Sequence, residues 1–131
     1  MFDDEYDVVV ASGEQVTAGL LALALRKRGL KARSWLGWQL KLKTNSSHGR
    51  ARIMGFDDSE LPDAVDAGEI AVIAGFQGVT DNGRVTTLGR GGSDLTAIAM
   101  AAAVDADLCQ IYTDVDGVYT CDPRVVPEAK K

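Results

Sequence analysis

The sequence is poor in the residues that build metal centres and disulfide frameworks. Among 131 residues it has one histidine, His48, and two cysteines, Cys109 and Cys121, which do not form a CxxC pair. A single histidine excludes a His-rich metal site, so no metal ligands are expected. We interpret both cysteines as free thiols in a reducing compartment. Because Cys109 lies in a predicted strand, we expect it to fill part of the core.

The sequence also lacks segments that would direct the chain to or across a membrane. No uninterrupted apolar run reaches the roughly 20 residues of a membrane-spanning helix, and the acidic start MFDDEYD is not a signal peptide. A cytoplasmic protein without a membrane partner is therefore expected. The phosphate-binding motifs GxxxxGK[ST] and GxGxxG are absent as well, which excludes the two commonest glycine-rich nucleotide loops.

What is present is an ordinary globular composition, with 46% hydrophobic and 25% charged residues, which fits one domain over residues 1–131. The net charge of −5 is unevenly distributed, because Arg26 to Arg52 holds nine Lys or Arg residues and no acid. Trp35 and Trp38 lie in this segment, so a nucleic-acid surface is one interpretation. We favour a solvated basic surface, or one that faces a small anion, because the charges fall on different predicted elements.

Alternating apolar runs and polar breaks predict an α/β fold. The β-branched run Asp7–Ala11 predicts a buried strand, followed by a helix that Ser12 caps and that ends near Arg28 before Gly29. A strand over Lys31–Leu36 would complete a βαβ unit and favours a parallel sheet.

The second half of the chain shows the same alternation. Arg52–Phe56 and Glu69–Phe76 predict strands, with a helix between them that has Pro62 in its first turn. Asn82-Gly83 predicts a two-residue hairpin turn. A helix of about ten residues is expected from Ser93, and a strand over Leu108–Thr113.

Three predicted loops at the ends of strands combine glycine with charged or hydroxyl residues. They are Ser12-Gly13-Glu14, Arg90 to Asp94 (RGGSD) and Thr113-Asp114. Ligands of open parallel sheets gather at such ends, and backbone N–H groups at a helix start can bind an anion. Glycine turns and a first-turn Asp94 also occur for structural reasons alone, so both interpretations stay open.

The segment TDVDG also permits a calcium interpretation, which the spacing excludes. Counting Asp114 as the first position of an EF-hand loop places Tyr119 where glycine is required and Val125 where the bidentate glutamate is required.

Read together, five segments resemble the aspartokinases of the amino-acid kinase family. They are VVVASGEQVTAGLLALAL, ARSWLGWQL, AVIAGFQG, GRVTTLGRGGSD and IYTDVDGVYTCDPRVVPEAKK. The resemblance covers about residues 7–131 and implies a three-layer α/β/α fold with a mainly parallel sheet. It also implies transfer of the γ-phosphoryl group of Mg-ATP to the side-chain carboxylate of L-aspartate, a step of lysine, threonine and methionine biosynthesis.

The resemblance assigns a role to each matching position. Arg90 would hold a substrate carboxylate and Glu14 the substrate ammonium, with Phe76 and Ser93 lining the same pocket. Asp94 would organise the reacting groups as the catalytic carboxylate. Four further residues would lie against the nucleotide: Thr113, Asp114, Tyr119 and Arg124.

Three parts of the aspartokinase pattern are missing from the sequence. A KFGGTS-like segment whose lysine contacts the phosphates is absent, as are a later nucleotide-contacting lysine and the ACT domains. We therefore expect an internal piece of the kinase domain with little activity alone. Uncovered strand edges favour a homo-oligomer. A non-enzymatic scaffold that keeps the motifs by descent is the alternative.

Overall fold

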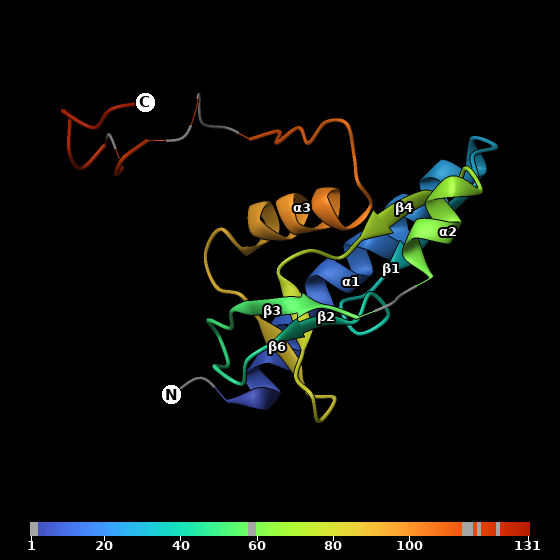
Figure 1. Ribbon diagram of the computed structural model, residues 1–131, viewed down its shortest axis with the longest axis horizontal. Coiled ribbons are helices and arrows are strands. Elements are labelled where there is room, and N and C mark those ends of the chain that lie inside the picture. The colour runs from blue at the N-terminus through green and yellow to red at the C-terminus, as the bar shows by residue number, and fades with distance from the viewer. Residues whose placement is uncertain (1–2, 58–59, 114–116, 118, 123) are drawn as a thin grey trace.

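The computed structural model describes residues 3–57, 60–113, 117, 119–122 and 124–131 (Figure 1). The helices are α1 (Asp4–Lys27), α2 (Leu61–Asp66) and α3 (Gly92–Ala103). The strands are β1 (Ala32–Trp35), β2 (Leu42–Thr44), β3 (Ile53–Phe56), β4 (Ile70–Ile73), β5 (Gln77–Val79) and β6 (Val85–Thr87).

The first element corrects the sequence prediction, because Asp7–Ala11 is helical and belongs to α1. The side chain of Asp3 caps this helix by accepting from Tyr6 N at 2.8 Å, and Ser12 lies inside the helix. The buried positions of α1 are Asp7, Ala11, Ala18 and Ala22, a spacing that repeats with the helical turn. Burial of this stripe outweighs the weak strand preference of the valine run, and the predicted βαβ unit loses its first strand.

The end of α1 is as predicted. Gly29 has φ +79°, and N–H groups of Gly29 and Leu30 bond back to the carbonyls of Arg26 and Leu25, which is a Schellman motif. Helix α1 is also long and apolar enough to cross a membrane by length and composition, although Asp7 and Glu14 interrupt it. Core helices of soluble proteins pass the same test, and α1 packs on β1, β4 and β6.

The strands pair in both directions. β1 pairs with β4 in parallel, and the second sheet has the order β3-β2-β5-β6. In that sheet β2 and β5 are parallel, whereas the β2–β3 and β5–β6 pairs are antiparallel. The α/β class is confirmed, and the sheet is less uniformly parallel than a doubly wound one.

Helices cover the two faces of the β1–β4 pair (Figure 1). On one face, Ala18 and Ala22 of α1 pack against Val72 and Ala74. The small alanine side chains let α1 approach the strands closely. On the other face, a second cluster joins residues of β1, the β1–β2 connection, α2 and α3: Trp35, Leu40, Leu61 and Met100. This is the expected α/β/α order.

Of two predictions for the second half of the chain, the structure supports the hairpin and contradicts the last strand. The hairpin between β5 and β6 is confirmed, but its loop has three residues and not the predicted two, since Thr80 N bonds to the Arg84 carbonyl at 2.9 Å and Gly83 has φ +81°. The predicted strand Leu108–Thr113 is wrong. Those residues are exposed and form no strand, and Cys109 is an exposed free thiol, not a core residue.

Candidate functional site

The loop between β6 and α3 has the geometry that its glycines predict. Gly89 and Gly91 have φ of +79° and +76°, and Gly91 is the N-cap of α3. Arg90 stands between them with an exposed side chain, and Ser93 and Asp94 are exposed in the first turn of the helix. The loop therefore presents a guanidinium beside the positive end of a helix dipole, a combination that attracts anions.

Phe76 lies directly against this helix start. A Cβ added to Gly92 would lie 2.8 Å from Leu88 Cβ and 3.0 Å from Phe76 Cδ2, so only glycine permits the close approach. Phe76 itself has φ +68°, an uncommon backbone conformation for a bulky residue. Its N–H donates to Thr96 Oγ1 at 3.0 Å and its carbonyl accepts from Leu88 N at 2.9 Å, which holds it there.

Ser93 and Glu14 complete the predicted substrate residues. The backbone of Gly75 is in contact with Ser93, because an added Cβ would lie 3.4 Å from Ser93 Oγ. Glu14 is exposed on α1, and its neighbour Gln15 donates to Gln77 Oε1 at 3.1 Å. This bond ties the Glu14 turn of α1 to the residue that follows Phe76. Phe76, Arg90 and Ser93 thus lie around the start of α3, whereas Glu14 is linked to this region through the bond of its neighbour Gln15 to Gln77.

The predicted nucleotide residues lie in the C-terminal segment, and Asp114 is outside the described residues. Thr113 and Arg124 are exposed and Tyr119 is half-buried. Arg124 pairs with Asp122 at 2.9 Å and, by its hydrogen bonds, lowers the pKa of that carboxyl below its usual range. The charge of Arg90 also lowers the pKa of Asp122, to a smaller extent.

Sequence reasoning missed a buried polar cluster next to this loop. The Asp7 carboxylate is fully buried and accepts from Thr87 N (3.1 Å), Thr87 Oγ1 (2.6 Å) and Gly49 N (2.9 Å). His48 Nδ1 lies 2.8 Å from the same carboxylate. We name Asp7, His48, Gly49 and Thr87 the Asp7 cluster. The sequence does hold a hint of this cluster, because Asp7 directly precedes a run of three valines. If such a run is buried, the carboxylate beside it is buried too, and a buried charge requires polar partners.

The Asp7 cluster joins three parts of the chain that are far apart in sequence. It links α1 to the β2–β3 connection and to the end of β6, two residues before Gly89. Gly89 in turn touches that connection, since an added Cβ would lie 3.1 Å from the Gly49 carbonyl. The backbone that leads into the Arg90 loop is therefore fixed from both sides.

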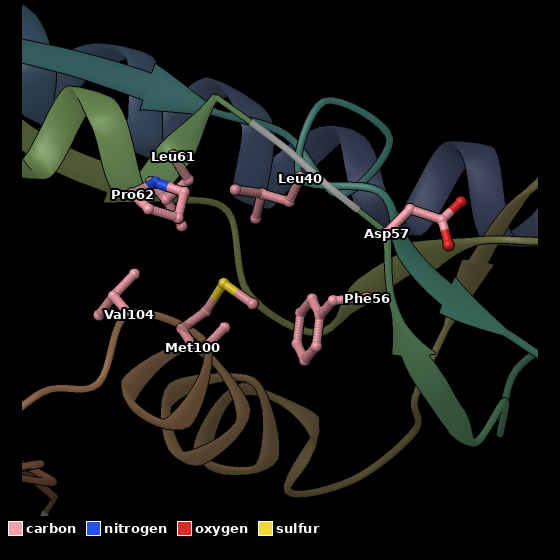
Figure 2. Close-up of a pocket in the computed structure, with 8 residues that line it drawn as sticks. Leu40, Phe56, Asp57, Leu61, Pro62, Met100 and Val104 are labelled. Carbon is pink, nitrogen blue, oxygen red and sulfur yellow. The ribbon is translucent and has the colours of Figure 1, made fainter.

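A separate cavity of about 340 Å³, with mostly apolar residues and Asp57 around it, lies between α2 and α3. Figure 2 shows Leu40, Phe56 and Met100 pointing into it, with Asp57 at its edge. None of the predicted site residues lines it. We interpret it as a packing gap of the core.

Comparisons with known proteins identify the family of the chain. The sequence matches the amino acid kinase family over residues 1–131. It is 58% identical over 127 residues to an aspartokinase of Pseudomonas aeruginosa, and 54% identical over 127 residues to aspartokinase 2 of Bacillus subtilis. Each alignment covers 97% of this chain and 31% of the relative, so the chain spans about a third of the relatives' length.

Solved structures show the same relationship. The structure of Escherichia coli aspartokinase III in complex with aspartate and ADP has a TM-score of 0.74 and 37% identity, and covers 98% of this chain and 29% of that protein. The aspartate kinase of Synechocystis has a TM-score of 0.65 and 43% identity, over 96% of this chain and 20% of that protein. The chain therefore belongs to the amino acid kinase family, and its sequence and fold are similar to part of the aspartokinases.

Proposed function

We propose that the chain forms the aspartate-binding part of an aspartate kinase, which transfers the γ-phosphoryl group of Mg-ATP to the side-chain carboxylate of L-aspartate. The observation that carries the proposal is the start of α3, where Arg90, Ser93 and Asp94 follow glycines in left-handed turns and Phe76 packs against Gly92. One of the solved relatives is a complex with aspartate and ADP.

The charges at this site suit an amino-acid substrate. L-Aspartate has two carboxylates and one ammonium, so it requires a cation and an anion at separate points. Arg90 supplies a planar guanidinium that can hold a carboxylate through two parallel hydrogen bonds. Glu14 supplies the carboxylate for the ammonium, and Phe76 with Ser93 would line the pocket between them. Both charged side chains are exposed, and no ion pair joins either to another described residue.

The remaining residues suit the phosphoryl donor. Phosphoryl transfer depends mainly on positioning and on stabilising charge, with little covalent work for the protein. Asp94, in the first turn of α3, would organise the reacting groups. Thr113, Asp114, Tyr119 and Arg124 would contact the nucleotide of Mg-ATP, a co-substrate. The chain spans about a third of the length of the relatives it matches, so binding is a better test of the chain than turnover.

The test is thermal unfolding of the chain alone, with L-aspartate, with Mg-ATP and with both. A ligand at about 100 times its Kd stabilises the folded state by about 2.7 kcal/mol, which raises the Tm by several degrees. We expect L-aspartate to raise the Tm of the wild type and of Arg28→Ala, an exposed arginine at the end of α1. Arg90→Ala should abolish the shift. A Tm that no ligand changes in the wild type would contradict the proposal and favour a non-enzymatic scaffold.

We also propose that the chain self-associates through α1. Four apolar residues form a stripe along its outer face and are 57–70% exposed: Val9, Val16, Leu20 and Leu23. Their spacing of seven, four and three residues is that of a helix-pairing seam. Light scattering at micromolar concentration should give a dimeric mass or larger, and Leu20→Glu should reduce it to the monomer. A monomeric wild type would refute self-association and leave the kinase proposal unaffected.

A further inference from the structure

An open cavity of about 700 Å³ lies between the β2–β3 connection and the start of α3, and nothing in the proposed function uses it. One side of it is polar, with Asn45, Ser47, Arg50 and Arg52, and the other side is apolar, with Leu88 and Leu95. The two arginines are separated by one residue, and both line the same cavity. We name this the Arg50–Arg52 cavity.

The positive charge of this cavity is not neutralised by the chain. Arg50 and Arg52 are exposed and form no ion pair with a described residue, although the sequence has 19 acids against 14 Lys and Arg. Arg33 lies 3.3 Å from Glu69 and Arg84 lies 2.8 Å from Asp4, whereas Arg90, like Arg50 and Arg52, forms no ion pair with a described residue. What sets Arg50 and Arg52 apart is that both line one cavity, where two unpaired cations are available to a partner that is not part of the chain.

The backbone that bears the two arginines is held in place before any ligand arrives. On one side of Arg50, Gly49 N donates to the buried Asp7 carboxylate at 2.9 Å, and on the other, Ala51 N donates to the Thr87 carbonyl at 2.8 Å. Arg52 N donates to Asn45 Oδ1 at 3.0 Å. A connection that only joined two strands would not require a buried carboxylate. A preorganised loop, in contrast, reduces the entropy lost on binding.

We propose that the Arg50–Arg52 cavity binds a compact oxyanion, a phosphate or carboxylate group, that its two guanidinium groups hold together. The planar fork of arginine matches both kinds of group, and two forks one residue apart can hold one anion from two directions. The apolar side, Leu88 and Leu95, would take the non-polar body of a ligand. Because Leu88 leads into Gly89, the bound anion would lie beside the Arg90 loop but in a site of its own.

The test is calorimetric titration of the chain with inorganic phosphate in a low-salt chloride buffer. We expect saturable binding that weakens at least tenfold in the double variant Arg50→Ala/Arg52→Ala. The matched control is Lys27→Ala/Arg28→Ala, which also removes two positive charges, from the exposed end of α1. It should bind phosphate as the wild type does. If the double alanine variant does not fold, Arg50→Lys/Arg52→Lys keeps the charge and should still bind several-fold more weakly, because lysine lacks the planar fork.

Two results would overturn the assignment. One is the absence of saturable binding in the wild type. The other is binding that is unchanged in Arg50→Ala/Arg52→Ala but lost in Arg90→Ala, which would place the anion at the glycine-rich loop. A second titration distinguishes the sources of the anion. Displacement of phosphate by ATP at lower concentration would identify the phosphates of a nucleotide, whereas phosphate binding that ATP does not affect would identify a free anion. The inference does not depend on aspartate binding, so the two can fail separately.

Discussion

Replacing Asp7 by alanine is expected to lower the free energy of unfolding by about 3–5 kcal/mol, because each buried hydrogen-bond donor left without an acceptor costs about 1–3 kcal/mol. The carboxylate is fully buried and accepts three hydrogen bonds from Thr87 and Gly49, with His48 at 2.8 Å. Alanine would leave those donors without an acceptor in a site that water does not reach. For a domain of this size the Tm should fall by roughly 10–20 °C.

The matched control for this variant is Asp4→Ala, a carboxylate on the same helix. Asp4 is 44% exposed and pairs with Arg84 at 2.8 Å, so its loss should cost less than about 1 kcal/mol. Urea unfolding followed by circular dichroism measures both variants, and equal m-values would show that only stability changed. Equal losses for Asp7→Ala and Asp4→Ala would contradict the role given to the cluster.

Amide hydrogen exchange can show which part of the chain the Asp7 cluster stabilises. In His48→Ala, amide hydrogen exchange should accelerate from Thr87 to Gly92, because the Asp7 cluster holds the strand end that leads into the Arg90 loop. Exchange in the C-terminal half of α1, which packs on β4 through Ala18 and Ala22, should stay as in the wild type. Uniform acceleration along the chain would indicate a global loss of stability without a specific link to the loop.

The parts of the fold that follow from local chemistry could be predicted from the sequence. Gly29 ends α1, Pro62 lies in the first turn of α2, and Gly83 closes the β5–β6 hairpin. At each of these positions the backbone conformation depends on one residue type, so no distant contact is required. The strands Lys31–Leu36 and Arg52–Phe56 were found from their apolar runs in the same way, within one or two residues of their ends.

The secondary-structure predictions that were wrong concern segments whose conformation depends on tertiary contacts. Asp7–Ala11 has the composition of a strand, but its charged residue is buried through partners from residues 48–49 and 87, which no local pattern reveals. Leu108–Thr113 has a similar composition and remains exposed without a strand partner. The same reasoning explains the site. Arg90, Ser93 and Asp94 share one motif, whereas the contact of Phe76 with Gly92 joins two segments that only the fold brings together.

The second large effect concerns the two charges of the proposed aspartate site, which should act on different parts of the ligand. Arg90→Ala should weaken L-aspartate binding about 10- to 100-fold, since charge-assisted hydrogen bonds contribute about 1.5–3 kcal/mol. Arg90→Lys should bind with intermediate affinity, because lysine keeps the charge but not the planar fork. Arg28→Ala, an exposed arginine at the end of α1, is the control and should leave the affinity unchanged. Calorimetric titration measures all four proteins.

Glu14 allows a sharper test, because succinate has the two carboxylates of aspartate and no ammonium group. If Glu14 holds the ammonium, Glu14→Gln should weaken L-aspartate about tenfold and leave succinate as in the wild type or slightly tighter, since a negative charge has been removed. Arg90→Ala should weaken both ligands together. This difference separates a specific amino-acid site from a general anion site, which the exposed guanidinium and the start of α3 could form without Glu14. Equal weakening of aspartate and succinate in Glu14→Gln would show that Glu14 does not contact the ammonium, and the turn of α1 that Gln15 ties to Gln77 would then have a structural role only.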